Sequence, residues 1–311
     1  MDNAFGDLLL EYTAPEWKQP RWLSGPRMDD PASQLAYARK LEQSGSLSAA
    51  ADEYDALVRE WHSSPEAPQA QVALARAQEA RGRKAKAFRE YQYALLAFPG
   101  SVPYGELVNA QMALLRDMEG ELGTGFLGMG ATMDAEDLAR LYRAVAVNAP
   151  GSPLAPECYF RMGELYSGPH CGHPDKALDP YETVMARYPQ SAWAPVAAFQ
   201  SARARVMLCR KYPRDEKRTR AALLSIDSVL ATWVPRMADP DTARAELREW
   251  RREVYAQQSH ADFEQAEFYD TIRRKPEAAI AAYQRFLQLH PDATESTRAR
   301  QRLAELGATA P

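Results

Sequence analysis

Two short stretches of the chain combine residue types that can do chemistry. The first is His170-Cys171-Gly172-His173, in an expected loop, with Cys158 one helix earlier. Imidazole and thiolate groups are zinc ligands, but zinc takes about four of them, and neither C-x2-C nor H-E-x-x-H is present. A zinc site and a Cys158–Cys171 disulfide stay open beside the favoured interpretation, a turn with exposed histidines and inert thiols.

The second stretch, Gly123-Thr124-Gly125-Phe126-Leu127-Gly128, matches the glycine pattern of dinucleotide-binding loops. That pattern needs a strand before it and a helix opening on it. Here a helical stretch, LVNAQMALLRDME, precedes it and no strand follows. We interpret it as a hairpin loop whose apolar Phe126, Leu127 and Met129 could form a contact tip. No nucleophile elbow, phosphate loop or repeated carboxylate pair occurs, so we expect a non-enzymatic chain without cofactor or metal.

Composition excludes several classes of protein. The chain has 311 residues, of which 46% are hydrophobic and 26% charged, enough to bury a large core. Its net charge of 38 − 42 = −4 argues against a nucleic-acid partner, and no apolar run approaches the ~20 residues of a membrane span. Residues 1–200 carry 18 − 26 = −8 and residues 201–311 carry 20 − 16 = +4. Such a difference suits a protein that contacts different partners with its two ends.

The elements that position these residues follow from a repeat. A small residue is followed four positions later by an aromatic, then eight positions later by proline and two later by serine. Six units fit this pattern, the first with His62 in the proline's place, the fifth degenerate and the last with its hydroxyl residue one place late: Ala50–Tyr54–His62–Ser64, Ala87–Tyr91–Pro99–Ser101, Leu138–Tyr142–Pro150–Ser152, Ala177–Tyr181–Pro189–Ser191, Ala222–Ile226–Pro235 and Ala279–Tyr283–Pro291–Thr294.

The spacing predicts the second helix of a hairpin, its end, and the start of the next hairpin. Residues four apart share a helix face, proline ends the helix, and serine is a good N-cap for the next one. The preceding helices are expected at 31–44, 68–81 and 153–166, each with a glycine near its end. Residues 241–275 contain no glycine or proline and are expected to form one long helix, or two with a hinge.

The expected fold is therefore all-α, a tetratricopeptide-like helical-hairpin solenoid of about five to six units. We divide it into an extended N-terminal arm at 1–30 with Trp17 and Trp22, N-terminal repeats at 31–200 with a Gly-rich insert at 120–130, and C-terminal repeats at 201–311 with the long helix and a basic surface.

The arrangement resembles the outer-membrane assembly lipoprotein family BamD. The resemblance is sharpest in the last unit, where the helix ending in HADFEQAEFY at 260–269 is followed by KPEAAI at 275–280 and Tyr283. Tyr188-Pro189-Gln190-Ser191 and the segment 98–101 are also similar to the family. Taken loosely, the resemblance covers residues 31–306.

The resemblance implies a scaffold on the periplasmic face of the outer membrane that helps insert β-barrel proteins. Its N-terminal end would bind C-terminal segments of barrel precursors, and its C-terminal units would dock on a barrel-assembly subunit. The start, MDNAFGDLLLEYTAPEW, is unlike a signal peptide, so an export segment and a lipid anchor would belong to the native N-terminus. The alternative is a generic tetratricopeptide scaffold in another envelope complex or in the cytoplasm.

Two sets of residues are candidates for binding. First helices line the groove of such arrays, which predicts a peptide site at the N-terminal end made by Tyr37, Arg39, Lys40, Arg76 and Glu79. A basic patch near the C-terminal end is the candidate for docking an acidic partner: Arg210, Lys211, Arg214, Lys217, Arg218, Arg273 and Arg274. Solvated helix faces are the alternative for each residue. A further hypothesis places residues 1–30 in the groove as an internal plug.

Overall fold

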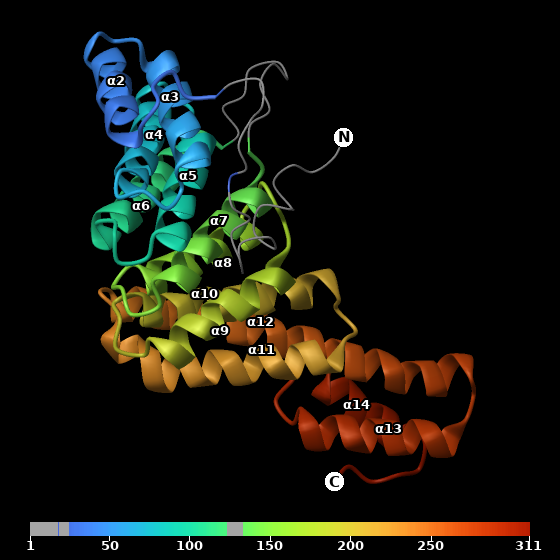
Figure 1. The fold of residues 1–311 in the computed structure, drawn as a ribbon. Coiled ribbons are helices and arrows are strands. Elements are labelled where there is room, and N and C mark those ends of the chain that lie inside the picture. Colours follow the sequence, from blue (N-terminus) through green and yellow to red (C-terminus); the bar gives the residue numbers. More distant parts are fainter. Residues whose placement is uncertain (1–17, 19–24, 123–132) are drawn as a thin grey trace. The chain divides into compact units, whose positions relative to one another are not determined.

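The computed structural model describes residue 18 and residues 25–122 and 133–311. These residues form thirteen α-helices and no strand, which confirms the all-α, tetratricopeptide-like fold (Figure 1). Trp17 and Trp22 of the arm, and the glycine-rich motif with Phe126, Leu127 and Met129, lie outside the described residues. No helix in the described part of the chain has the length and apolar character needed to cross a bilayer.

The helices follow one another along the chain in the order that the repeats predict. In chain order they are α2 (Pro31–Gln43) and α3 (Leu47–Glu60), α4 (Ala67–Ala80) and α5 (Lys84–Ala97), α6 (Tyr104–Gly120) and α7 (Ala135–Asn148), α8 (Ala155–Ser167) and α9 (Pro174–Arg187), α10 (Trp193–Lys211) and α11 (Glu216–Ser228), α12 (Pro240–Glu267) and α13 (Pro276–Leu289), and finally α14 (Ser296–Glu305).

The repeated small and aromatic residues form the inside of the hairpins. The small residue of every unit is fully buried, and the aromatic of each clear unit is at most 2% exposed: Tyr54, Tyr91, Tyr142, Tyr181 and Tyr283. Each ring therefore fills the space left beside a side chain such as Ala50 or Ala87 on the same helix face. The sequence repeat is a packing repeat.

Glycines end the first helices as expected. Gly45 follows α2 with φ +79°, and Gly82 follows α4 with φ +69°, a conformation that glycine adopts without a steric penalty. Arg274, before α13, is a non-glycine residue in this region, with φ +49°.

The expectation that the repeated serine is an N-cap is wrong. Helix α4 begins at Ala67, three residues after Ser64, and its N-cap is Glu66, which makes no side-chain cap. A tight turn intervenes, in which the Ala67 N–H donates to the Ser64 carbonyl at 3.2 Å. Side-chain caps occur on other helices, α2, α7, α11 and α12, where aspartates make them: Asp30, Asp134, Asp215 and Asp239.

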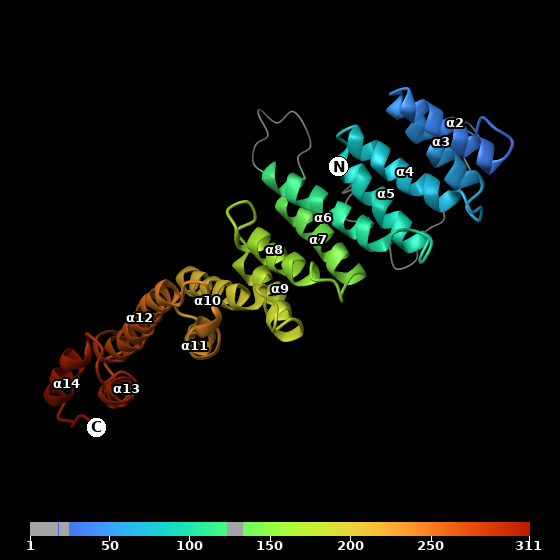
Figure 2. The ribbon, with the colours of Figure 1, turned by 90° about the vertical axis from the view of Figure 1, so that its left-hand side faces the viewer.

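The chain divides into two compact units, residues 1–165 and 166–311, with the boundary inside α8. In unit 1 the hairpins α2/α3 and α4/α5 lie side by side and share one apolar cluster (Figure 2). Its largest side chains include Tyr54, Leu57, Leu74 and Phe98. Because α3 packs on both α2 and α4, the two repeats are continuous with each other.

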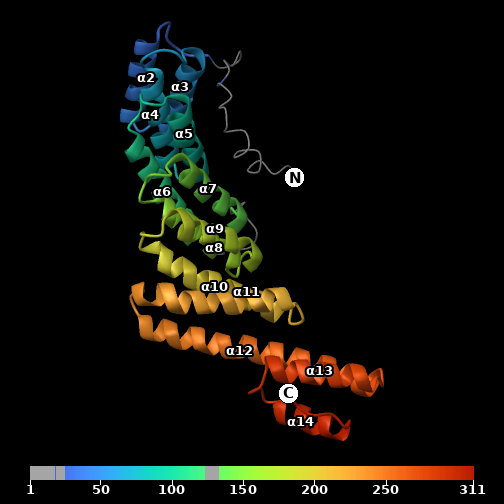
Figure 3. The ribbon, with the colours of Figure 1, turned by 90° about the horizontal axis from the view of Figure 1, so that it is seen from below.

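Unit 2 has two apolar clusters, and α12 belongs to both. Leu247 and Val254, in the first half of α12, pack with residues of α10 and α11. Phe263 and Ala266, in its second half, pack with α13 and α14. Figure 3 shows α11 beside the first part of α12 and α13 beside the second. The prediction of a long helix is confirmed, since α12 runs for 28 residues and continues as a π-turn over Phe268–Ile272.

Candidate functional site

A groove of about 360 Å³ lies on the first helices of unit 1, and we call it the arginine groove. Arg39 and Arg76 line it from α2 and α4, and residues 101–103, before α6, also line it. Apolar surface comes from Val72, Ala73 and Val102. The groove thus combines two guanidinium groups from successive repeats with an apolar floor.

Both arginines have loose partners. Arg39 Nη2 donates to Gln69 Oε1 at 3.0 Å. Arg76 Nη2 lies 3.6 Å from Glu106 Oε2, and the side chains of Arg76 and Glu106 are both more than half exposed. Exposed pairs of this kind contribute little, about 0–1 kcal/mol. Each guanidinium has five N–H donors, so most of them remain able to bind a carboxylate or a peptide carbonyl.

Only part of the expected peptide site is brought together here. Tyr37 is half-buried and Lys40 exposed, and neither is among the residues that line the arginine groove. Glu79 has a structural contact, because its Oε2 accepts the hydroxyl proton of Tyr91 at 2.7 Å. Glu42, which was not a candidate, lines the groove while accepting from Tyr54.

The expected basic patch lies at two turns of unit 2. Arg210, Lys211, Arg214, Lys217 and Arg218 surround the α10–α11 turn, whereas Arg273 and Arg274 precede α13. The Arg273 guanidinium stacks on Phe268 at 5.4 Å.

Two arginines at the α10–α11 turn, Arg210 and Arg218, are paired with carboxylates. Arg210 makes two bonds of 2.7 Å to Glu253, and Arg218 Nε donates to Asp215 at 2.9 Å. The hydrogen bond from Arg210 lowers the pKa of Glu253 from its ordinary value. The turn is therefore less cationic than its residue types indicate.

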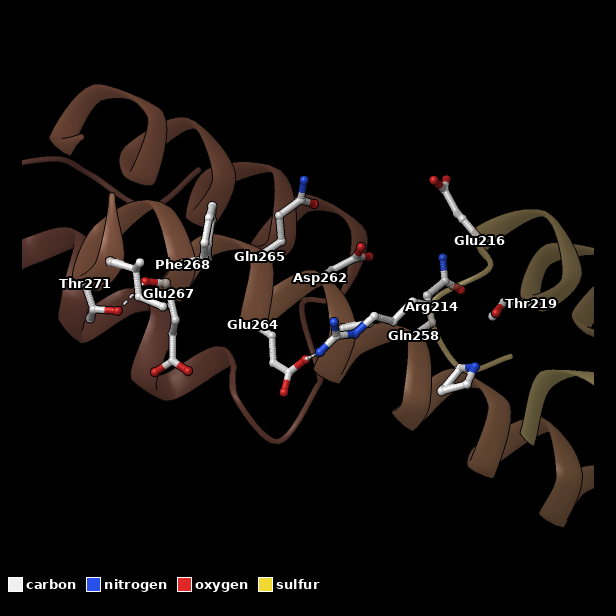
Figure 4. A pocket seen from close by; sticks show the side chains of 13 residues that line it. Arg214, Glu216, Thr219, Gln258, Asp262, Glu264, Gln265, Glu267, Phe268 and Thr271 are labelled. Carbon is white, nitrogen blue, oxygen red and sulfur yellow. Dashed lines mark hydrogen bonds and ion pairs between the residues drawn. The ribbon is translucent and has the colours of Figure 1, made fainter. Parts of the chain in front are cut away.

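A pocket of about 640 Å³ lies between this turn and α12 (Figure 4). Arg214 extends across it and pairs with Glu264 at 3.4 Å. Three further carboxylates line the same pocket, from Glu216, Asp262 and Glu267, and the exposed apolar side chains of Phe268 and Ile272 form its end. Sequence reasoning missed this acidic character, although three of the four carboxylates lie within the expected long helix at 262–267.

The carboxylates of the pocket have partners of their own. Asp262 lies 2.7 Å from His290 Nε2, and Glu267 pairs with Arg298 at 2.5 Å. Since these contacts join α12 to the elements after it, much of the acidic lining stabilises the last repeat.

Cys158, one helix before the histidine–cysteine motif, lies in the core. Cys158 is fully buried with its Sγ 3.3 Å from Met112 Sδ, and it forms no disulfide, which contradicts the open Cys158–Cys171 alternative. Burial raises the pKa of the Cys158 thiol to about 12. His170 and His173 are exposed, as expected for a turn.

One comparison with known proteins bears on this arrangement. Residues 260–293, which cover the end of α12 and all of α13, match the family described as a tetratricopeptide repeat. No curated protein matches the chain. Together with the successive packing of the helices, the match supports a tetratricopeptide-repeat protein.

Proposed function

We propose that this tetratricopeptide-repeat chain is a scaffold that binds segments of other proteins, without catalysis of its own. Proteins built from such repeats generally bind other proteins. The observation that carries the proposal is the arginine groove, where Arg39 and Arg76 from successive first helices line one groove with apolar Val72 and Val102.

The chemistry of the groove favours a peptide with a carboxylate. A guanidinium binds a carboxylate through paired, charge-assisted N–H donors, and two of them about one repeat apart would fix the direction of the bound segment. The apolar floor would take a hydrophobic side chain next to the charge. A free C-terminal carboxylate that follows hydrophobic residues satisfies both requirements.

The finer proposal is a BamD-like role in outer-membrane assembly. Its support is the sequence similarity of the last unit, together with a groove suited to C-terminal segments at the N-terminal end. In this role the ligands are C-terminal segments of barrel precursors, and unit 2 docks on a subunit of the barrel-assembly machinery. The chain would then act at the periplasmic face of the outer membrane, held by a lipid on its native N-terminus.

The second candidate is a general scaffold in another envelope or cytoplasmic complex. It is favoured by the nature of the repeated residues, since Ala50, Tyr54 and their equivalents are buried and serve packing in any such array. The start of the native gene bears on this choice, because an export signal ending in a lipidated cysteine supports the BamD-like role over a cytoplasmic scaffold, whereas a true cytosolic start excludes that role.

Peptide binding to groove variants tests the proposal. We expect Arg39→Ala with Arg76→Ala to weaken binding of a barrel precursor's C-terminal peptide about 10-fold or more, because each charge-assisted pair contributes on the order of 1.5 kcal/mol. Lys40→Ala is the matched control, since Lys40 is exposed on α2 but does not line the groove. An unchanged affinity with intact helicity would exclude the groove as the site.

A further inference from the structure

In unit 1, two buried glutamines of the first helices α2 and α4 bond to glutamates of the second helices α3 and α5. In the first hairpin, Gln34 is fully buried and its Nε2 donates to the carbonyl and to Oε2 of Glu53, at 3.2 and 2.7 Å. Its Oε1 accepts the backbone N–H groups of Arg27 and Met28, both at 3.0 Å. The Arg27 side chain reaches the same Glu53, 3.5 Å away.

The second hairpin repeats this arrangement. Gln71 is fully buried, and its Nε2 donates to the carbonyl and to Oε2 of Glu90, at 2.9 and 2.8 Å. Glu90 is again bound to a basic residue, because Lys18 Nζ lies 2.7 Å from its Oε2. The two Gln–Glu pairs, Gln34–Glu53 and Gln71–Glu90, thus hold two basic residues of the same N-terminal segment.

Lys18 is held more firmly than Arg27. Its ammonium also bonds to Asp55 at 2.9 Å, and its side chain is only 11% exposed. The ammonium lies 5.0 Å from the centre of the Tyr93 ring, whose hydroxyl accepts the Lys18 backbone N–H at 3.2 Å. Two carboxylates and an aromatic face are the surroundings that bind a lysine well.

One acceptor of the second pair is unused. Gln71 Oε1 is buried and has no hydrogen-bond partner among the described residues, whereas Gln34 Oε1 accepts two backbone N–H groups. A buried carbonyl without a donor costs about 1–3 kcal/mol. At the matching position of the first hairpin, Gln34 Oε1 binds main-chain N–H groups, which are therefore suitable donors for Gln71 Oε1.

We propose that the α3/α5 face, with its two Gln–Glu pairs, is a second binding surface that takes an extended polypeptide carrying basic residues. Arg27 and Lys18 are its resident ligands within the chain, and a lysine-bearing segment of a partner protein competes with Lys18 for Asp55, Glu90 and Tyr93. The carboxylates exclude phosphate-rich ligands such as nucleic acids and acidic membranes. The arginine groove and this face therefore select segments of opposite charge.

A labelled peptide of residues 14–28 of this chain is the probe, and fluorescence anisotropy with the full-length protein is the measurement. In the wild type, Lys18 occupies the site, so the added peptide binds weakly. In Lys18→Ala the ammonium contacts with Asp55 and Glu90 are absent, although Arg59 still pairs with Asp55, and we expect the peptide to bind about 10-fold more tightly. Lys86→Ala, which removes an exposed lysine from α5, is the matched control and leaves binding at the wild-type level.

Two further variants identify the site. Adding Asp55→Asn or Glu90→Gln to Lys18→Ala should return the affinity to the wild-type level or below, and a probe with alanine in place of Lys18 should bind about 10-fold more weakly. Circular dichroism checks that each variant stays helical. Three results would overturn the proposal. The peptide could bind the wild type and Lys18→Ala equally, it could bind neither, or its affinity could stay unchanged when Asp55 or Glu90 is substituted.

Discussion

The hydroxyl of Tyr54 donates a hydrogen bond of 2.6 Å to Glu42 Oε2, joining the middle of α3 to the end of α2. The same contact recurs at 2.7 Å from Tyr91 to Glu79 and at 2.6 Å from Tyr142 to Glu119. Burial, followed by the hydrogen bond to Glu42, raises the pKa of Tyr54, so its hydroxyl remains a donor. The repeated aromatic therefore fills the hairpin and also fixes how its two helices meet.

The first prediction concerns this hydroxyl. Tyr54→Phe keeps the ring and removes the donor, and we expect it to lower the free energy of unfolding by about 1 kcal/mol, because half-exposed Glu42 can recover part of the bond from water. Urea denaturation measures the change. Tyr212→Phe, at a residue that is 43% exposed, is the control and should change stability little. Equal losses in both variants would contradict a specific role for the Tyr54–Glu42 bond.

A second prediction concerns the buried carboxamide of Gln34. Gln34→Leu keeps much of the volume but removes the acceptor for the Arg27 and Met28 amides. Hydrogen exchange at these two amides should accelerate by about 10-fold or more, since a lost bond of ~1.4 kcal/mol changes local opening by that factor. Amides in α4 and α5 should keep their protection. Unchanged exchange at residues 27 and 28 would show that Gln34 does not hold the segment.

The third prediction is a pH dependence in the last repeat. Arg302 donates to both oxygens of buried Asp270, at 2.5 and 3.1 Å, and these bonds lower the pKa of Asp270 below its ordinary 3.8. A lowered folded pKa stabilises the fold above about pH 3.8, and this stabilisation is lost as the pH falls through the folded pKa.

Asp270→Asn measures that contribution. At pH 7 it should lower the free energy of unfolding by about 1–2 kcal/mol, and the difference from wild type should shrink below about pH 3.8. Thermal melts across this range test it, with exposed Asp292→Asn as the control. A difference that stays constant down to pH 2 would mean that the charge of Asp270 is not what stabilises the repeat.

The fourth prediction concerns thiol reactivity. Because burial raises the pKa of Cys158 to about 12, almost none of it is thiolate at pH 8, and the reagent cannot reach the sulfur. We expect iodoacetamide to label Cys171, which is only half-buried, at least about 10-fold faster than Cys158. Mass spectrometry of peptides from the native chain distinguishes the two, and denatured protein should label equally. Fast labelling of Cys158 in the native chain would contradict the burial of its thiol.

The hairpins were predictable because they depend on neighbours in sequence. Small and aromatic residues four apart on one face specify the packing of a hairpin, and Gly45 and Gly82 end helices where the pattern stops. The prediction of serine caps was wrong, because Ser64 lies in a backbone-bonded turn that precedes the first residue of the next helix. Short-range patterns identify the break between helices better than they identify the capping residue.

The binding surfaces depend on contacts between residues far apart in the sequence. Arg39 and Arg76 share a groove because one repeat separates them, which a repeat pattern can predict. Nothing in the spacing indicates that Arg210 pairs with Glu253, 43 residues away, or that Lys18 reaches Glu90, 72 residues away. Counting charges over a region thus predicted a basic patch, whereas pairing across helices leaves a pocket lined by four carboxylates and Arg214.

The length of α12 has a mechanical consequence for unit 2. A helix of 28 residues spans about 42 Å, and its two halves are anchored in separate apolar clusters. One cluster cannot rotate or tilt relative to the other unless the hydrogen-bonded helix α12 twists or bends. A force applied to α13 or α14 is therefore transmitted along α12 to α10 and α11, and this part of unit 2 resists bending.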